Sequence, residues 1–307
     1  MSAARPTTPT NSARSPKSTA SSRRKIAEQR AADQRRRRQI WLAGTGIGVV
    51  VAILATLVAV KAAGSGGAQT TAAPPATVST QTTHQVVTAA TAVPAADLAA
   101  VGSGAVADPA AAISHGTPLT SGGKPEILYM GAEYCPFCAA ERWPLVVALS
   151  RFGTFTGLQL TKSSSTDEFP STNTFTFLHA TYTSKYLAFD TVELQDVNRN
   201  PLQTPTAAQQ QLLDTYDAAP YTSSPGAIPF VDFGNQFVVS GASYDPQVLQ
   251  GQSWSTIAAA LSDPSSAIGK SIDGAANRLT AAICSMTGDQ PSNVCSAPSI
   301  ISLKAGL

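Results

Sequence analysis

The chain has 307 residues and a formal net charge of +2, and 43% of its residues are hydrophobic. Its length exceeds what one compact domain needs, so we expect tails or a second unit beside the folded part. The small net charge conceals an asymmetry. Residues 1–39 hold eleven Lys and Arg against two acidic residues, whereas residues 62–307 hold nine against seventeen. This split excludes a chain that is basic throughout and points to a boundary such as a membrane.

Residues 40–60 form an uncharged run of 21 residues. At about 1.5 Å per residue, a helix of this length spans roughly 30 Å, the thickness of a bilayer core. Four arginines at 35–38 precede the run and only Lys61 follows it, so the positive-inside rule predicts a cytoplasmic N-terminus. The alternative, a cleaved signal peptide, is disfavoured by the length of the run and of the preceding tail. We therefore predict a single-pass protein of the cell membrane with an extracytoplasmic C-terminal domain.

The segments that flank this run lack the composition of a folded domain. Residues 1–39 are rich in Ser, Thr, Pro, Arg and Ala, which predicts a disordered, basic cytoplasmic tail. Aromatic side chains do not interleave with its charges, which disfavours nucleic-acid binding. Residues 61–86 are rich in Ala and Thr, which predicts a flexible linker. The extracytoplasmic domain then covers residues 87–307, with 87–112 as a leading segment of ambiguous structure.

The most informative motif is a Cys-Pro-Phe-Cys dithiol, Cys135 and Cys138, which follows the apolar run 127–130 and precedes a helix-like stretch. A dithiol between a strand and a helix is typical of thiol–disulfide exchange. Unpaired backbone N–H groups and the helix dipole stabilise a thiolate at Cys135, and Cys138 lies one turn on, within reach of a disulfide. Pro136 suits the first turn because its φ is preset and its missing N–H has no partner there.

Other interpretations of the four cysteines are weaker. A structural disulfide usually closes a longer loop than that of the dithiol, because the entropic gain grows with loop size. A zinc site would need Cys284 and Cys295, which are separated by ten residues rather than two to four, and the three histidines show no ligand spacing. We therefore expect no metal site and no cofactor. Cys284 and Cys295 most simply form a structural disulfide in an exported segment, with an electron-relay pair as the alternative.

The remaining pattern predicts a mixed β-sheet with helices on both faces. The predicted elements are a hairpin over 117–130, a helix over 139–152 kinked at Pro144, strands at 157–160, 174–180 and 186–194, a helix over 207–216 capped by Thr206, a strand from Pro229 that turns at Gly234-Asn235 into 237–240, and helices over 253–261 and 267–286.

The motifs resemble the thioredoxin superfamily. The string Ala132-Glu133-Tyr134-Cys135-x-x-Cys138 is similar to that family's Ala-Glu-Trp-Cys-x-x-Cys, and Ile228-Pro229 before an apolar strand is similar to its cis-proline loop. The resemblance implies that Cys135 is the attacking thiolate and Cys138 the resolving thiol. It also implies that Pro229 is a cis-proline beside the dithiol and that Ile228 faces the substrate. The pattern as a whole includes Ala-Ala-Glu-Arg-Trp directly after the dithiol and a late cysteine pair. It also resembles membrane-anchored thioredoxin-like proteins of actinobacteria and archaea that are known only as a domain of unknown function.

Two departures from thioredoxin qualify the resemblance. Tyr129 stands where thioredoxin has a buried aspartate that deprotonates the resolving thiol, which weakens a reductase role. The separation of 91 residues between Cys138 and Pro229 is about double that of a minimal thioredoxin. We therefore predict a thioredoxin-like α/β fold with an insertion at about residues 165–220, between the dithiol helix and the cis-proline strand.

The resulting hypothesis is a membrane-anchored, extracytoplasmic thiol–disulfide oxidoreductase that acts on cysteines of exported proteins. Because the space outside the membrane is oxidising, a disulfide donor or isomerase is favoured over a reductase. A membrane protein would recycle the dithiol. The alternatives are a non-catalytic thioredoxin-like binding module and a thiol protein that handles copper or assists cytochrome assembly.

Overall fold

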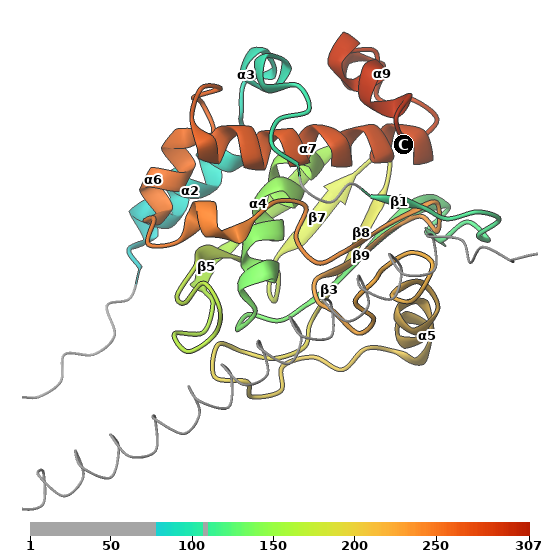
Figure 1. Ribbon diagram of the computed structural model, residues 1–307. Helices are drawn as coiled ribbons and strands as arrows, with labels where there is room; N and C mark the ends of the chain where they lie inside the picture. Colours follow the sequence, from blue (N-terminus) through green and yellow to red (C-terminus); the bar gives the residue numbers. More distant parts are fainter. Residues whose placement is uncertain (1–77, 107–109) are drawn as a thin grey trace, which may run out of the picture. The chain divides into compact units, whose positions relative to one another are not determined.

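The computed structural model describes residues 78–106 and 110–307 (Figure 1). The predicted cytoplasmic tail 1–39, the predicted transmembrane helix 40–60 and the linker up to residue 77 lie outside the described residues. Among the helices of the described ranges, none combines the length and the hydropathy that crossing a bilayer requires.

A mixed β-sheet is built on β3 (Lys124–Gly131). Strand β3 pairs in parallel with β8 (Ala188–Glu193) and antiparallel with β9 (Phe230–Phe233), which turns into β10 (Phe237–Ser240). Two short strands complete the sheet: β1 (Ala111–Ala112) pairs with β10, and β2 (Thr120–Ser121) pairs with the start of β3. Strand β3 is buried from residue 127 onward, as expected for a strand whose two faces are both covered.

The two faces of the sheet carry different clusters of side chains, because successive residues of a strand point to opposite faces. Ile127 and Val231 pack toward the dithiol helix α4 (Pro136–Leu149) and the long helix α7 (Ala267–Met286). On the other face, Leu128 and Phe230 belong to a cluster that α5 (Ala207–Tyr216) covers. Figure 1 shows α4 and α7 on one side of the sheet and α5 on the other, so the helices flank the sheet on both faces.

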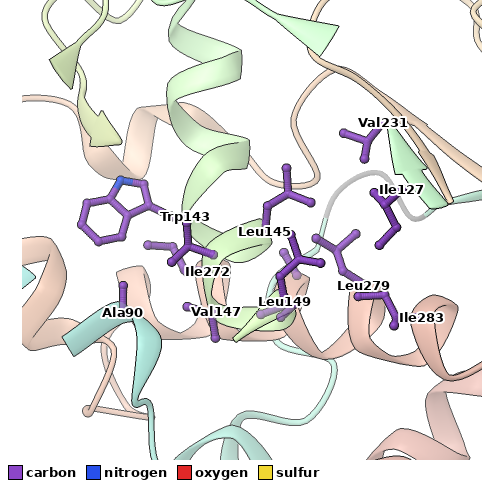
Figure 2. Packing of buried hydrophobic residues seen from close by; sticks show 14 of the residues in the cluster. Ala90, Ile127, Trp143, Leu145, Val147, Leu149, Val231, Ile272, Leu279 and Ile283 are labelled. Carbon is purple, nitrogen blue, oxygen red and sulfur yellow. The ribbon is translucent and has the colours of Figure 1, made fainter. Parts of the chain in front are cut away.

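The larger cluster lies around α4 and α7. Figure 2 shows Trp143, Leu145 and Leu149 of α4 beside Ile272, Leu279 and Ile283 of α7, all fully buried. Further helices border this core: α2 (Thr80–Thr91), α3 (Ala95–Val101), the 3₁₀ helix η1 (Pro246–Leu249), α6 (Trp254–Ala260), α8 (Ser292–Cys295) and α9 (Pro298–Lys304).

Pro144 lies inside α4, where it removes the N–H that would bond to the carbonyl of Ala140. The hydroxyl of Tyr244 donates to that carbonyl at 2.9 Å and so satisfies it. Helix α4 begins at Pro136 and ends at Leu149, three residues earlier at each end than predicted. The earlier start arises because Cys135 itself caps the helix.

Strands outside the central sheet form two small antiparallel pairs. Strand β4 (Gly153–Thr156) pairs with β7 (Thr181–Ser184), and β5 (Gln159–Lys162) pairs with β6 (Asn173–Thr176). The strand predicted at 157–160 is confirmed only at 159–160, where it overlaps β5; its predicted start is wrong because Gly157 has a φ of 78° and turns the chain between β4 and β5.

The predicted insertion at 165–220 is wrong in its bounds. That range contains β8, which pairs with β3 along its whole length and therefore belongs to the central sheet. The added strands β4 to β7 instead lie between residues 153 and 184. Among the described strands β8 pairs with β3 alone and so lies at an edge of the sheet, where its residues are mostly half-buried and its sequence is not a continuous apolar run.

The predicted linker is wrong in its last residues, because helix α2 begins at Thr80. The hydroxyl of Ser79 accepts a hydrogen bond from the N–H of Thr82 at 3.0 Å and caps the helix. Val86 and Ala90, one turn apart, are buried in the main cluster. This apolar stripe fixes the segment onto the domain. The bounds predicted for the helices at 207–216 and 267–286 are confirmed.

Asp273 gives the fold a testable pH dependence. It is buried in α7, and neither carboxylate oxygen has a hydrogen-bond partner among the described residues. Burial, together with the charge of Asp97, raises the pKa of Asp273 to about 8. Its unfolded pKa is about 3.9, so the folded state binds the extra proton and the free energy of unfolding falls as the pH rises from about 4 to about 8.

We expect Asp273→Asn to remove this loss. The gain in the free energy of unfolding relative to the unmodified protein should be larger at pH 8 than at pH 5 by about 4 kcal/mol. Urea denaturation at the two pH values measures the difference. An equal effect at both values would show that the carboxyl does not titrate on unfolding.

Candidate functional site

The dithiol lies where β3 ends and α4 begins. Cys135 is the N-cap residue of α4: its backbone is extended, and its Sγ accepts a hydrogen bond from the N–H of Cys138 at 3.2 Å. Both cysteines are free thiols in this structure. Cys135 retains 5% exposure, whereas Cys138 is fully buried. The first sulfur is therefore the one that an incoming group reaches, and the second lies beneath it.

The two thiols differ in acidity. The hydrogen bond with Cys138 lowers the pKa of Cys135 below that of an ordinary cysteine, and backbone N–H groups of the first turn add to the effect. Burial raises the pKa of Cys138 well above the ordinary value. Because the thiolate is the nucleophile in thiol chemistry, Cys135 is the more reactive sulfur of the pair.

The loop that enters β9 closes over the dithiol. The thiol of Cys135 donates to the carbonyl of Ile228 at 3.4 Å, and the Ile228–Pro229 peptide bond is cis. This contact follows from the sheet register: Met130 pairs with Phe230, so the residues just before β9 lie beside the residues just after β3. Pro229 precedes the first paired residue of β9, and the ladder loses no donor.

The structure thus brings the four predicted site residues together. Cys135, Cys138 and Ile228 belong to one cluster of side chains, with Pro229 next in sequence. Of the aromatic residues near the motif, Tyr134 and Phe137 pack against this cluster, whereas Trp143 is buried in the main core.

Contacts to the added strands cover one side of the dithiol. The N–H of Ser164 donates to the carbonyl of Tyr134 at 2.9 Å, and the rings of Phe137 and Phe169 meet edge to face with centroids 5.8 Å apart. Both Ser164 and Phe169 lie in the segment between β5 and β6. The sequence did not predict that this segment packs on the dithiol, because no residue near the motif indicates which distant loop contacts it.

The exposed side chain of Arg199 also packs beside the dithiol motif. The guanidinium of Arg199 lies over the ring of Tyr134, 3.7 Å from its centre, and pairs with Asp167 at 2.9 Å. The loop that follows β8 is held next to the motif by a hydrogen bond from the N–H of Glu133 to the carbonyl of Gln195 at 2.8 Å.

A cleft of about 580 Å³ opens beside the dithiol. Phe137 and Ile228, which flank the sulfurs, form part of its wall, and Phe169 lies on the same wall. Most of the remaining wall comes from the loop at 221–224 and from residues 238–242 and 244–246, with Ala111, Glu168 and Ala227 completing it. The cleft therefore lies next to residues that contact the dithiol, although neither cysteine forms part of its wall.

Two charged residues of the dithiol helix are fully buried, which the sequence did not indicate. Glu141 accepts hydrogen bonds from the N–H and the hydroxyl of Ser243 at 2.8 and 2.9 Å, and burial raises its pKa to about 7. Arg142 pairs with Glu193 at the end of β8. Adjacent charged residues in a helix are usually solvated, so only the three-dimensional partners could have identified them.

Cys284 and Cys295 form a disulfide that joins the end of α7 to the end of α8. Both are buried in the main cluster and not in the cluster that holds the dithiol. This placement favours a structural role over an electron relay. Across the described part of the chain, no group of three or more His, Cys, Asp and Glu side chains is arranged to hold a metal ion.

Comparison with known proteins gives one match. Residues 111–285 match the model of a family described as "Domain of unknown function (DUF929)". The matched range runs from β1 almost to the end of α7 and includes the dithiol and the cis-proline loop, whereas Cys295 lies beyond it. No curated protein and no solved structure shows a significant match.

Proposed function

Because the chain belongs to the DUF929 family of domains of unknown function, we propose its activity from the site itself: a thiol–disulfide oxidoreductase with a thioredoxin-like domain. One observation carries the proposal. A thiol of lowered pKa caps a helix, a second thiol lies one turn on, and a cis-proline loop contacts the first thiol. Residues 40–60 anchor the domain in the cell membrane, so that its clients are exported proteins with cysteines.

The thioredoxin-like assignment is supported by the position of each part. The dithiol follows a central strand and starts a helix, as the resemblance implies, and Pro229 stands beside it from a point 91 residues later in sequence. The mixed sheet with helices on both faces is also consistent with that fold.

Disulfide donation is the proposed reaction. A client thiolate attacks Sγ of Cys135 in the Cys135–Cys138 disulfide; a client–Cys135 bond forms, and Cys138 leaves as a thiolate that takes a proton. The client's second thiolate then attacks the client sulfur of this mixed disulfide and releases Cys135 as a thiolate. The client loses two electrons and gains a disulfide, and the protein is left as a dithiol. A membrane redox partner accepts the two electrons and restores the disulfide.

Ile228 and Pro229 are the proposed client-binding residues. In the reduced state seen here, the carbonyl of Ile228 accepts from the Cys135 thiol. Oxidation or formation of a mixed disulfide removes that proton and frees the carbonyl for a client N–H. The cleft beside Phe137 receives the client segment next to its cysteine.

Replacing Cys138 with serine tests the function. Because this variant lacks the resolving thiol, we expect the full-length protein to accumulate mixed disulfides between Cys135 and exported proteins, seen as slow-migrating species on non-reducing gels that vanish on reduction. Mass spectrometry identifies the partners. The matched control is Cys135→Ser/Cys138→Ser, which should show no such species. The absence of mixed disulfides in Cys138→Ser (an empty trap) would contradict catalysis and favour a binding module that does not turn over.

A further inference from the structure

A buried ion pair lies behind the dithiol. Nε and Nη2 of Arg142 donate to Oε1 and Oε2 of Glu193 at 3.0 and 2.7 Å, and both side chains are completely buried. The N–H of Phe177 donates to Oε1 of the same carboxylate at 3.1 Å. Both oxygens of Glu193 are therefore occupied by donors, and the guanidinium keeps its charge because this carboxylate offsets the cost of burial.

The third nitrogen of the guanidinium, Nη1, is left without a partner. It is buried, and no described residue accepts a hydrogen bond from it. The guanidinium carbon lies 5.7 Å from the ring centre of Tyr129, whose hydroxyl is likewise buried without a partner. A Cβ on Gly131 would collide with that hydroxyl, so the cluster lies directly under the residues that lead into the dithiol. Unpaired buried donors are rare because they are costly, and they call for a functional explanation.

The sequence spacing places this cation beneath the sulfurs. Arg142 follows Cys138 by four residues in α4, so the two side chains lie on the same face of the helix, one turn apart. Glu193 pairs in register with Gly131, just before the dithiol loop. The sulfur of Cys138 and the guanidinium share an interior with little water, where a charge acts strongly on its neighbours.

We propose that Arg142 is a positioning residue that stabilises the thiolate forms of Cys135 and Cys138 and thereby makes the dithiol an oxidant of its clients. The inference rests on the proposed function and adds the residue that favours disulfide donation over the reverse reaction. A cation that favours thiolate favours the reduced state over the disulfide, and a dithiol with a stabilised reduced state is the stronger oxidant.

The effect matters most at Cys138. When a client thiolate attacks Cys135, the electrons of the broken bond leave on Cys138, inside the protein. Burial opposes a charge there, and Arg142 counteracts burial by lowering the pKa of that thiol. The hydrogen bond with Cys138 is the main cause of the lowered pKa of Cys135, and Arg142 acts in the same direction.

The test compares charge variants of the full-length protein by two readouts that need no client: the pKa of Cys135 from thiolate absorbance, and the reduction potential in glutathione buffers at about pH 8. The double variant Arg142→Met/Glu193→Gln removes the cation without leaving a lone buried charge. We expect it to raise the pKa of Cys135 and to shift the equilibrium with glutathione at least tenfold toward the protein disulfide, which corresponds to about 30 mV.

Two single variants separate charge from damage to the fold. Glu193→Gln removes the negative charge that partly cancels the charge of Arg142. The pKa of Cys135 should therefore fall and the reduction potential of the dithiol should rise. Loosened packing would not shift the two quantities in these directions. Arg151→Met is the matched control: Arg151 is a partly buried arginine that hydrogen-bonds to Asn277 and Thr280 beyond the far end of α4, and its loss should change neither readout.

An unchanged pKa and potential in the double variant, or shifts of the same sign in both it and Glu193→Gln, would overturn the proposal. Both results are independent of the Cys138→Ser trap. An empty trap with these shifts present would reject the proposed function and leave the role of the charge intact.

Discussion

Replacing Glu193 with alanine is expected to lower the free energy of unfolding by roughly 3–5 kcal/mol. The substitution leaves the Arg142 guanidinium fully buried without its counter-charge, and it also removes the acceptor of the Phe177 N–H. An uncompensated charge in a protein interior loses its hydration and gains little in return, so most of the cost is desolvation. Chemical denaturation at neutral pH measures the change.

Two further variants test whether the loss of stability in Glu193→Ala arises from the burial of the charge of Arg142. Arg142→Met/Glu193→Ala removes both charges and should recover most of the lost stability, because the desolvation cost disappears with them. Asp167→Ala breaks the pair with Arg199, in which the arginine side chain is 54% exposed, and should cost less than about 1 kcal/mol. Similar losses for Glu193→Ala and Asp167→Ala would contradict the account of a buried pair.

Replacing Cys135 with serine is expected to reduce exchange with a small disulfide to the uncatalysed level. A serine hydroxyl does not ionise at neutral pH, and the remaining thiol, Cys138, is fully buried with a raised pKa. In the unmodified dithiol, Cys135 should be alkylated on the order of tenfold faster than Cys138 or more. Mass spectrometry after brief alkylation of the reduced protein measures the two rates.

The pH dependence of this alkylation has a defined sign. Because its pKa is lowered, Cys135 stays a thiolate to lower pH than a free cysteine, and its rate should fall only as the pH drops through that lowered value. The matched comparison is Cys138→Ala, which keeps Cys135 and the backbone N–H of residue 138 but removes the side-chain hydrogen bond between the two residues; its profile should move to higher pH. Equal alkylation of the two cysteines would contradict the assigned roles.

Local signals in the sequence predicted much of the fold. Helix α5 was predicted with its observed bounds because Thr206 is a favourable N-cap residue, and the structure adds that Gln209 completes a capping box. The bounds of α7 were also predicted correctly. The position of the dithiol at the start of a helix was also predicted, since Pro136 suits the first turn. The structure confirms this position, because Cys135 caps α4.

Other features depend on partners far apart in sequence and could not be predicted. The charge of Arg142 is buried because Glu193, 51 residues later, lies beside it through the pairing of β8 with β3. Strand β8 was placed inside the predicted insertion because the insertion was inferred from the separation of 91 residues between Cys138 and Pro229, and this separation does not show which strand pairs with β3. The cover over the dithiol arises from Phe169, which no spacing relates to Phe137.

The reduction potential of the Cys135–Cys138 pair tests the central claim most directly. We expect one reversible two-electron transition in glutathione buffers, at a potential well above the approximately −300 mV below which structural disulfides lie, and closer to oxidants near −120 mV than to reductants near −270 mV. A pair that does not interconvert between dithiol and disulfide in any of these buffers would contradict the account, and the motif would then be a structural part of the fold.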